Sequence, residues 1–169
     1  MFTKLAFLAG LVATIPAVSA VQYQGYANTV SCSGDAFGCN DGGAVCCSLP
    51  TAFGFSAQFN DLPSGTQGQG YKDACKAFMF SVFGPGTKCW NGGGARATHL
   101  NWFHSPQGRR SIPTRDDGAE CATPDSFTYT DDAGVTRTIR VPGNMTEAEK
   151  ISTLRQKGDF ATLAKYELY

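Results

Sequence analysis

Two adjacent cysteines, Cys46 and Cys47, constrain this chain more than any other feature of its sequence. Successive side chains of an extended segment point to opposite sides, so the two sulfur atoms tie one segment to two different parts of the fold. Seven cysteines are present in 169 residues: Cys32, Cys39, Cys46, Cys47, Cys75, Cys89 and Cys121. Their number and spacing predict a framework of at least three disulfides, formed in an oxidising compartment.

Sequence spacing alone does not choose the cysteine pairs. One local bond is expected between Cys75 and Cys89, across the turn Gly84-Pro85-Gly86, and Cys121 is expected to be the cysteine left over. The competing use of clustered cysteines is a zinc site. The six residues between Cys32 and Cys39 do not match the usual spacing of zinc ligands. We therefore expect disulfides, and neither a metal ion nor a cofactor.

The first 20 residues have the build of a signal peptide. Lys4 precedes an apolar run over residues 5–15, and small residues up to Ala20 suit cleavage after that position. Residues 21–169 are enough for one domain with a hydrophobic core. No later segment is long and apolar enough to span a bilayer. The expectation is a single secreted, extracellular, cysteine-rich domain that is soluble and monomeric.

Strand patterns dominate the middle of the chain. Residues 21–47 are rich in glycine, serine and cysteine and predict loops. Alternation of apolar residues predicts a half-buried strand over residues 53–59. The apolar run over residues 77–83 predicts a buried strand, and residues 100–103 predict another.

The C-terminal part carries the clearest local signals. Alternating β-branched residues over 127–130 and 135–141, joined by a short glycine-containing turn, predict a hairpin. A capping box from Thr146 to Glu149 predicts the start of a helix, and Asp159 predicts a second start after Gly158. The fold class is therefore mainly β (α+β): a small disulfide-stapled β domain with a β-hairpin and a short C-terminal helical pair at about residues 146–167.

Charge is segregated along the chain. Residues 74–115 contain no Asp or Glu, whereas the flanking segments are acidic. If its basic and aromatic residues converge, they would form a positive face for an anionic polymer or partner, with binding that weakens as salt rises. The candidate binding residues are Trp90, Arg96, Trp102, Arg109, Arg110 and Arg115. The alternative is that the segments neutralise one another within one fold.

Catalytic signals are weak. The two histidines, His99 and His104, are five residues apart and so lie on opposite faces of a strand, which argues against a metal pair. Either histidine would suit a ribonuclease that pairs it with an acid and an arginine. The sequence lacks a G-x-S-x-G elbow. Asp116-Asp117 and Asp131-Asp132 sit in turns, where calcium binding is the minor alternative.

Two surface modifications are also suggested by the sequence. Asn144-Met145-Thr146 is an N-glycosylation sequon ahead of a predicted helix. Arg109-Arg110, in a segment with proline and glycine, is a candidate dibasic cleavage site.

The leader, the cysteine doublet and the many glycine and aromatic residues together resemble a fungal small secreted cysteine-rich protein of the effector-candidate class. The segment from Phe55 to His104 also bears a faint similarity to the β-rich repeat of crystallin-like proteins. The first resemblance implies a protein that binds a host or cell-surface target in virulence or host interaction, rather than an enzyme. The expected partners are an extracellular protein or an anionic wall polysaccharide, and not DNA. The alternatives are an antimicrobial or killer-type toxin and a small secreted hydrolase.

Overall fold

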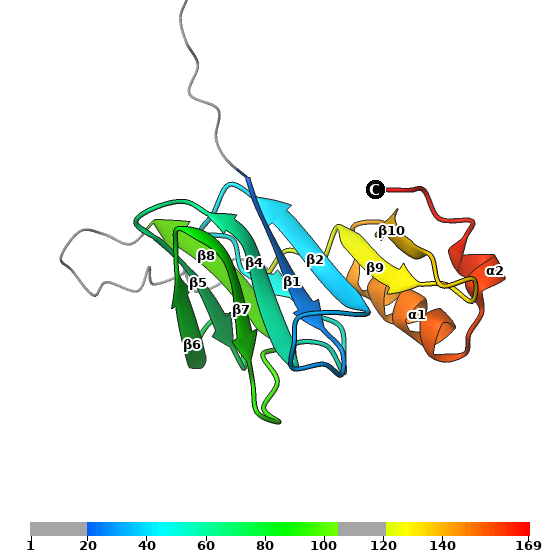
Figure 1. Cartoon of the computed structure of the whole chain (residues 1–169), viewed down its shortest axis with the longest axis horizontal. Helices are drawn as coiled ribbons and strands as arrows, with labels where there is room; N and C mark the ends of the chain where they lie inside the picture. Colours follow the sequence, from blue (N-terminus) through cyan, green and yellow to red (C-terminus); the bar gives the residue numbers. More distant parts are fainter. Residues whose placement is uncertain (1–19, 105–120) are drawn as a thin grey trace, which may run out of the picture.

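The computed structural model describes residues 20–104 and 121–169 and is mainly β, with two short helices at the C-terminal end (Figure 1). The strands are β1 (Val21–Tyr26), β2 (Ala36–Asp41), β3 (Cys47–Ser48), β4 (Ser56–Leu62), β5 (Thr66–Tyr71), β6 (Phe78–Phe83), β7 (Gly86–Asn91), β8 (His99–His104), β9 (Ser126–Thr130) and β10 (Thr136–Arg140). The helices are α1 (Met145–Gln156) and α2 (Phe160–Leu163). The predicted fold class is thus confirmed.

The strands form two antiparallel sheets that pack on each other. One has the order β10-β9-β2-β1-β4-β7 and the other the order β3-β8-β5-β6. Aromatic rings fill the space between them: Phe59 of β4 meets Phe80 of β6 edge-on at 6.4 Å, and Phe80 stacks on Trp90 of β7 at 3.8 Å. A Cβ atom on Gly68 would lie 2.4 Å from the Phe59 ring, so this close approach of the sheets requires glycine in β5.

The last strands and the helices form one end of the molecule (Figure 1). Strand β9 pairs with β2, and Phe127 packs on Phe37 with ring centroids 4.5 Å apart. Helix α1 buries Ala148 and Ile151 in the same hydrophobic core. The predicted hairpin, β9 and β10, is confirmed, and so is the helical pair.

The caps of the helices match the sequence in one case and differ in the other. Asp159 caps α2 as predicted, and Gly158 follows α1 with a φ of +69°. The N-cap of α1 is Asn144 and not Thr146: the Asn144 side chain accepts a hydrogen bond of 2.8 Å from the Glu147 amide. Asparagine caps helices as well as threonine does, so the helix starts two residues earlier than the capping box suggests.

Two predictions about strands were wrong. Residues 21–47 hold β1 and β2, which lie inside the six-stranded sheet, because pairing on both sides outweighs their loop-like composition. Strand β6 is not buried: it is an edge strand, and Phe78 and Phe83 are 49% and 60% exposed. The strand predicted at residues 53–59 is present but begins at Ser56.

Three disulfides link the framework: Cys32–Cys89, Cys39–Cys47 and Cys46–Cys75. The expected Cys75–Cys89 bond was wrong, because Cys75 precedes β6 in one sheet and Cys89 lies on β7 in the other. The adjacent cysteines do tie one segment to two places, as predicted. Cys121 is outside the three bridges, also as predicted.

Candidate functional site

Sheet edges offer unpaired backbone groups, and most edges of this protein are protected. At the β10 edge the C-terminal residues add backbone hydrogen bonds, with the Arg140 amide donating to the Glu167 carbonyl at 2.7 Å and the Tyr169 amide donating to the Thr138 carbonyl at 3.0 Å. At β3 the Ser48 amide donates to the Ala122 carbonyl at 2.9 Å. These two edges are therefore covered by other parts of the chain.

Strand β7 is protected in a different way. It carries a charged side chain, Lys88, and the Cys32–Cys89 disulfide anchors it. Its pairing with β4 is irregular between Phe59 and Leu62, a break that twists an edge strand away from regular pairing. A charge and a bulge are two of the devices that keep an edge from accepting another strand.

Strand β6 carries no charged side chain, and the one irregularity in its pairing with β5 lies near its start, where Phe78 and Phe80 are opposite Tyr71 and Gly70. We call its outer side, Phe78–Phe83, the open edge. Among the described residues β6 pairs only with β5. Its six residues include no charged residue and no proline. Because the Gly84 amide donates to the Thr66 carbonyl of β5, the alternation of an antiparallel ladder turns the amides of Ser81 and Phe83 outward.

The side chains of β6 divide between the core and the surface. Phe80 is buried, whereas Phe78 and Phe83 are about half exposed. Phe78 is held edge-on against Tyr71, with ring centroids 6.0 Å apart. Burial raises the pKa of Tyr71 to about 12, so its hydroxyl stays protonated and donates to Gln69. The open edge therefore combines outward backbone amides with two half-exposed aromatic rings at its ends, of which Phe78 is held against Tyr71.

The basic face expected from the sequence is not assembled by the described residues. Arg96 is used within the fold: its guanidinium donates to the Ala27 and Ala52 carbonyls and lies 5.1 Å from the centre of the Phe55 ring. Trp90 is half buried against Phe80. Arg109, Arg110 and Arg115 lie outside the described residues, so the salt dependence of binding stays a prediction.

Trp102 cannot serve as an aromatic platform for a ligand because it is 1% exposed. Its indole nitrogen donates to the Asp41 carboxylate at 3.1 Å, and the Tyr23 hydroxyl donates to the other oxygen of that carboxylate. Burial, and then the nearby Asp41 charge, raise the pKa of Tyr23, which keeps this hydroxyl a donor. The polar groups of Trp102 and Tyr23 are therefore both hydrogen-bonded to Asp41 within the core.

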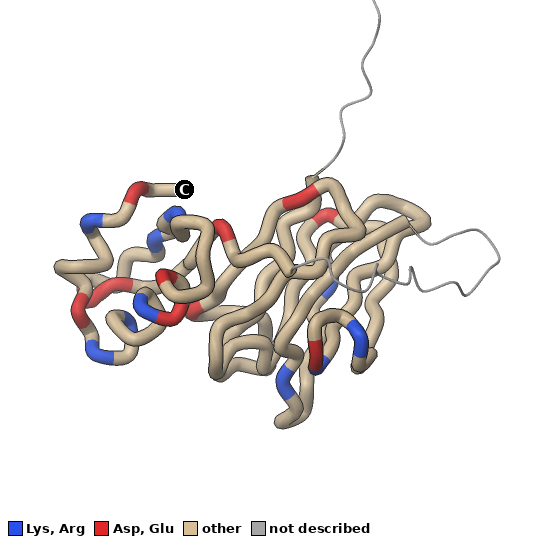
Figure 2. The backbone as a smooth tube through the Cα atoms, turned by 180° about the vertical axis from the view of Figure 1, so that it is seen from behind, with Lys and Arg blue, Asp and Glu red and all other residues tan. Residues whose placement is uncertain are grey.

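Charged residues gather at the other end of the molecule (Figure 2). Residues 20–104 hold four basic and four acidic residues, whereas the shorter stretch 121–169 holds six and seven. The sandwich therefore presents few charges to a partner. This distribution favours an uncharged or apolar contact over an electrostatic one.

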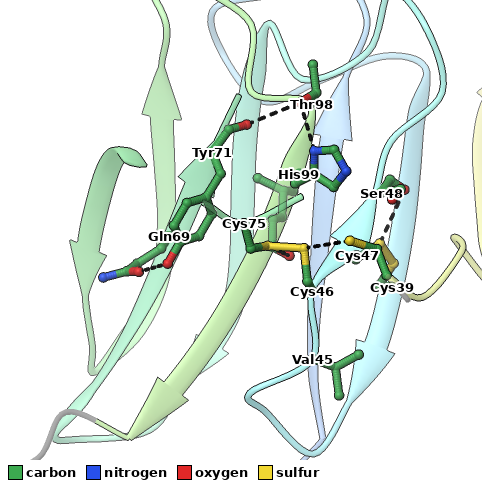
Figure 3. Close-up of a disulfide and its surroundings, with 12 residues drawn as sticks. Cys39, Val45, Cys46, Cys47, Ser48, Gln69, Tyr71, Cys75, Thr98 and His99 are labelled. Carbon is green, nitrogen blue, oxygen red and sulfur yellow. Dashed lines mark hydrogen bonds between the residues drawn. A yellow bond between two sulfur atoms is a disulfide. The ribbon is translucent and has the colours of Figure 1, made fainter. Parts of the chain in front are cut away.

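The histidines are the first and last residues of β8. His99 places its Nδ1 atom 2.8 Å from the Thr98 hydroxyl (Figure 3). His104 is exposed, with its ring centroid 5.9 Å from that of Trp102. In residues 20–104 and 121–169, no three His, Cys, Asp or Glu side chains gather as metal ligands.

The remaining candidate residues either have a structural role or lie outside the described residues. Asp131 holds the β9–β10 turn, accepting from the Ala133 and Val135 amides and from Arg137, while Asp116-Asp117 lies outside the described residues. Asn144 is exposed, as a glycosylation site requires. No helix in the described part of the chain is long and apolar enough to cross a membrane.

A small pocket of about 140 Å³ lies where α1 meets the loop after β1. Its charged groups already pair with each other, since the Arg155 Nε atom is 2.9 Å from an Asp35 carboxylate oxygen. Phe160 also covers the guanidinium, 5.2 Å from its ring centre. The pocket thus has no spare charge with which to bind a ligand, and it joins α1 to the sandwich.

Sequence reasoning missed the open edge. The uncharged sequence of β6 is the feature that could have indicated an open edge, but an uncharged run is equally typical of a buried strand. Only the strand order places it at an edge.

Comparison with known proteins gives one match. The model of the family ARB_05566_N, described as an N-terminal domain, matches residues 22–125. No curated protein and no solved structure matches the chain.

Proposed function

The chain belongs to the ARB_05566_N family, and we propose that it is a secreted, non-enzymatic protein that binds an extended segment of an extracellular partner protein along β6. The open edge is the observation that carries this proposal. A strand added there would pair with the outward amides of Ser81 and Phe83, the mode of recognition known as β-augmentation. In the effector-like reading of the sequence, that partner is a host or cell-surface protein.

The chemistry of the edge favours a particular class of segment. Phe78 and Phe83 provide apolar contact at its two ends, and the strand between them has no charge to be satisfied. Backbone hydrogen bonds would supply affinity, and side chains at alternate positions of the partner would supply specificity. An extended segment with apolar or β-branched residues at every second position fits these requirements.

Secretion is part of the proposal and has its own support. Three disulfides suit an oxidising compartment. The leader-like residues and the start of β1 at Val21 agree with cleavage after Ala20. Intact-mass analysis of the protein from culture medium should give a chain that begins at Val21. A mass that retains residues 1–20 would contradict secretion by this route.

Binding is tested with a displayed library of random peptides selected on the wild-type protein. We expect enrichment of extended peptides with apolar residues at alternate positions. Their affinity for the Phe83→Lys variant should be at least tenfold lower than for the wild-type protein, because a lysine on an edge strand opposes strand addition. The matched control is Val135→Lys, which replaces another half-exposed apolar residue, in the β9–β10 turn. It should bind like wild type.

The place of binding is measured by hydrogen exchange. The selected peptide should slow exchange of the Ser81 and Phe83 amides, which point away from β5. Failure to enrich any peptide, equal loss of binding in Phe83→Lys and Val135→Lys, or protection only at other strands would each contradict the proposed function.

A further inference from the structure

The sulfur atom of the seventh cysteine lies against one of the disulfides. The Cys121 sulfur is 3.1 Å from the Cys46 sulfur, which is bonded to Cys75. Figure 3 shows this disulfide joining the segment before β3 to the loop before β6, with His99 on the same side of the sheet. Cys46 therefore has two possible bonding partners at close range.

Backbone hydrogen bonds fix this contact. The Ala122 amide donates to the Cys46 carbonyl at 2.7 Å, and the Ala122 carbonyl accepts from the Ser48 amide at 2.9 Å. Ala122 also forms a parallel bridge with Cys47. Since residues on both sides of the contact are held by these bonds, the approach of Cys121 to Cys46 is a built feature of the fold.

The present partner of Cys46 is in a strained loop. Ala74 and Cys75 have φ values of +29° and +58°, in the left-handed region that residues other than glycine avoid. The loop is closed at its base by the Lys72 amide, which donates to the Ala77 carbonyl at 2.9 Å. Release of Cys75 from its disulfide would let these two residues relax.

We propose that Cys46 is the centre of an intramolecular thiol–disulfide exchange in which Cys121 is the nucleophile and Cys75 the leaving group. Cys121 gives its proton to water and its thiolate attacks the Cys46 sulfur. The Cys46–Cys121 bond forms, the Cys46–Cys75 bond breaks, and the Cys75 thiolate takes up a proton. No oxidant or reductant is consumed. The protein then exists as two disulfide isomers that differ in the freedom of residues 72–77.

The exchange is independent of the proposed binding function. Cys39–Cys47 and Cys32–Cys89 keep their bonds in both isomers, so the sheets stay stapled. Only the loop that leads into β6 changes its anchorage, and the partly exposed Cys75 becomes a thiol open to reaction with external disulfides or alkylating reagents.

Disulfide mapping tests the exchange. The wild-type protein is incubated at pH 8 without added thiol, acidified at intervals, alkylated with N-ethylmaleimide and digested with pepsin at low pH. We expect a Cys46–Cys121 linked peptide to appear together with alkylated Cys75. Both should be absent from Cys121→Ser, which keeps Cys46–Cys75. If only Cys46–Cys75 and alkylated Cys121 are found at every time, the exchange is refuted.

A second variant makes the alternative bond directly. In Cys75→Ser, Cys46 and Cys121 should form a disulfide, and residues 72–77 should exchange amide hydrogens at least tenfold faster than in Cys121→Ser. Recovery of Cys75→Ser with both remaining sulfurs alkylated would also overturn the proposal. Should this variant fail to be secreted, the time course of the wild-type protein still decides.

Discussion

The contribution of each disulfide to the free energy of unfolding should increase with the length of the loop that it closes. Cys32–Cys89 joins residues 57 apart in sequence, whereas Cys39–Cys47 joins residues 8 apart. Loop-closure entropy in the unfolded chain predicts a contribution of about 4 kcal/mol for the first bridge and about 2.5 kcal/mol for the second. The two bridges are compared by replacing both of their cysteines with alanine.

Packing predicts the opposite order, which makes the comparison informative. Cys39 and Cys47 are 4% and 0% exposed, while Cys89 is on the surface. Loss of buried sulfur atoms would therefore cost more at Cys39–Cys47. Urea denaturation gives the free energy of unfolding of each variant from its midpoint and slope. A larger loss for Cys39→Ala/Cys47→Ala than for Cys32→Ala/Cys89→Ala would refute the loop-closure reasoning.

Two further predictions concern the C-terminal part. Asn144→Ala should lower the free energy of unfolding by about 1 kcal/mol through loss of the N-cap, whereas Thr146→Ala should leave it nearly unchanged in the unglycosylated protein, as chemical denaturation would show. Both changes should remove a glycan mass from the secreted protein if the sequon is used. Burial raises the pKa of Asp125 above its ordinary value of 3.8, so its protonated form favours the fold. The stabilisation by protonated Asp125 is fully present at pH values below its ordinary pKa and is lost as pH rises through its raised pKa in the folded protein. Thermal melts recorded between pH 3 and pH 7 should show this pH dependence in the wild-type protein and not in Asp125→Asn.

The parts of the fold that the sequence predicts are local. The β9–β10 hairpin and the cap of α2 each depend on residues close together in the chain, and their chemistry is readable without a structure. The start of α1 shows the limit of this reading. Asn144 and Thr146 are both good caps, and the choice between them depends on where the chain leaves β10.

The parts that the sequence does not predict depend on distant pairing. Strand β1 lies between β2 and β4, and this central position buries Tyr23 in a segment whose composition is typical of loops. The disulfide pairs also depend on distant contacts, because Cys32 and Cys89 come together only when β7 pairs with β4. The open edge depends on strand order alone, so the run Phe78–Phe83 gave no sign of which side would stay exposed.

The match to the family model ends at residue 125, just before β9, yet the packing does not divide there. Phe127 of β9 lies 4.5 Å from Phe37 of β2 and 6.1 Å from Phe53, so one core spans both sides of the boundary. We predict a single cooperative transition, in which tryptophan fluorescence from the sheets and helical circular dichroism from α1 change at the same urea concentration. Phe127→Ala removes a fully buried ring and should cost about 3–5 kcal/mol, shifting both signals equally. Loss of the helical signal at lower urea, with the fluorescence transition unmoved, would show instead that residues 126–169 unfold separately from the sandwich.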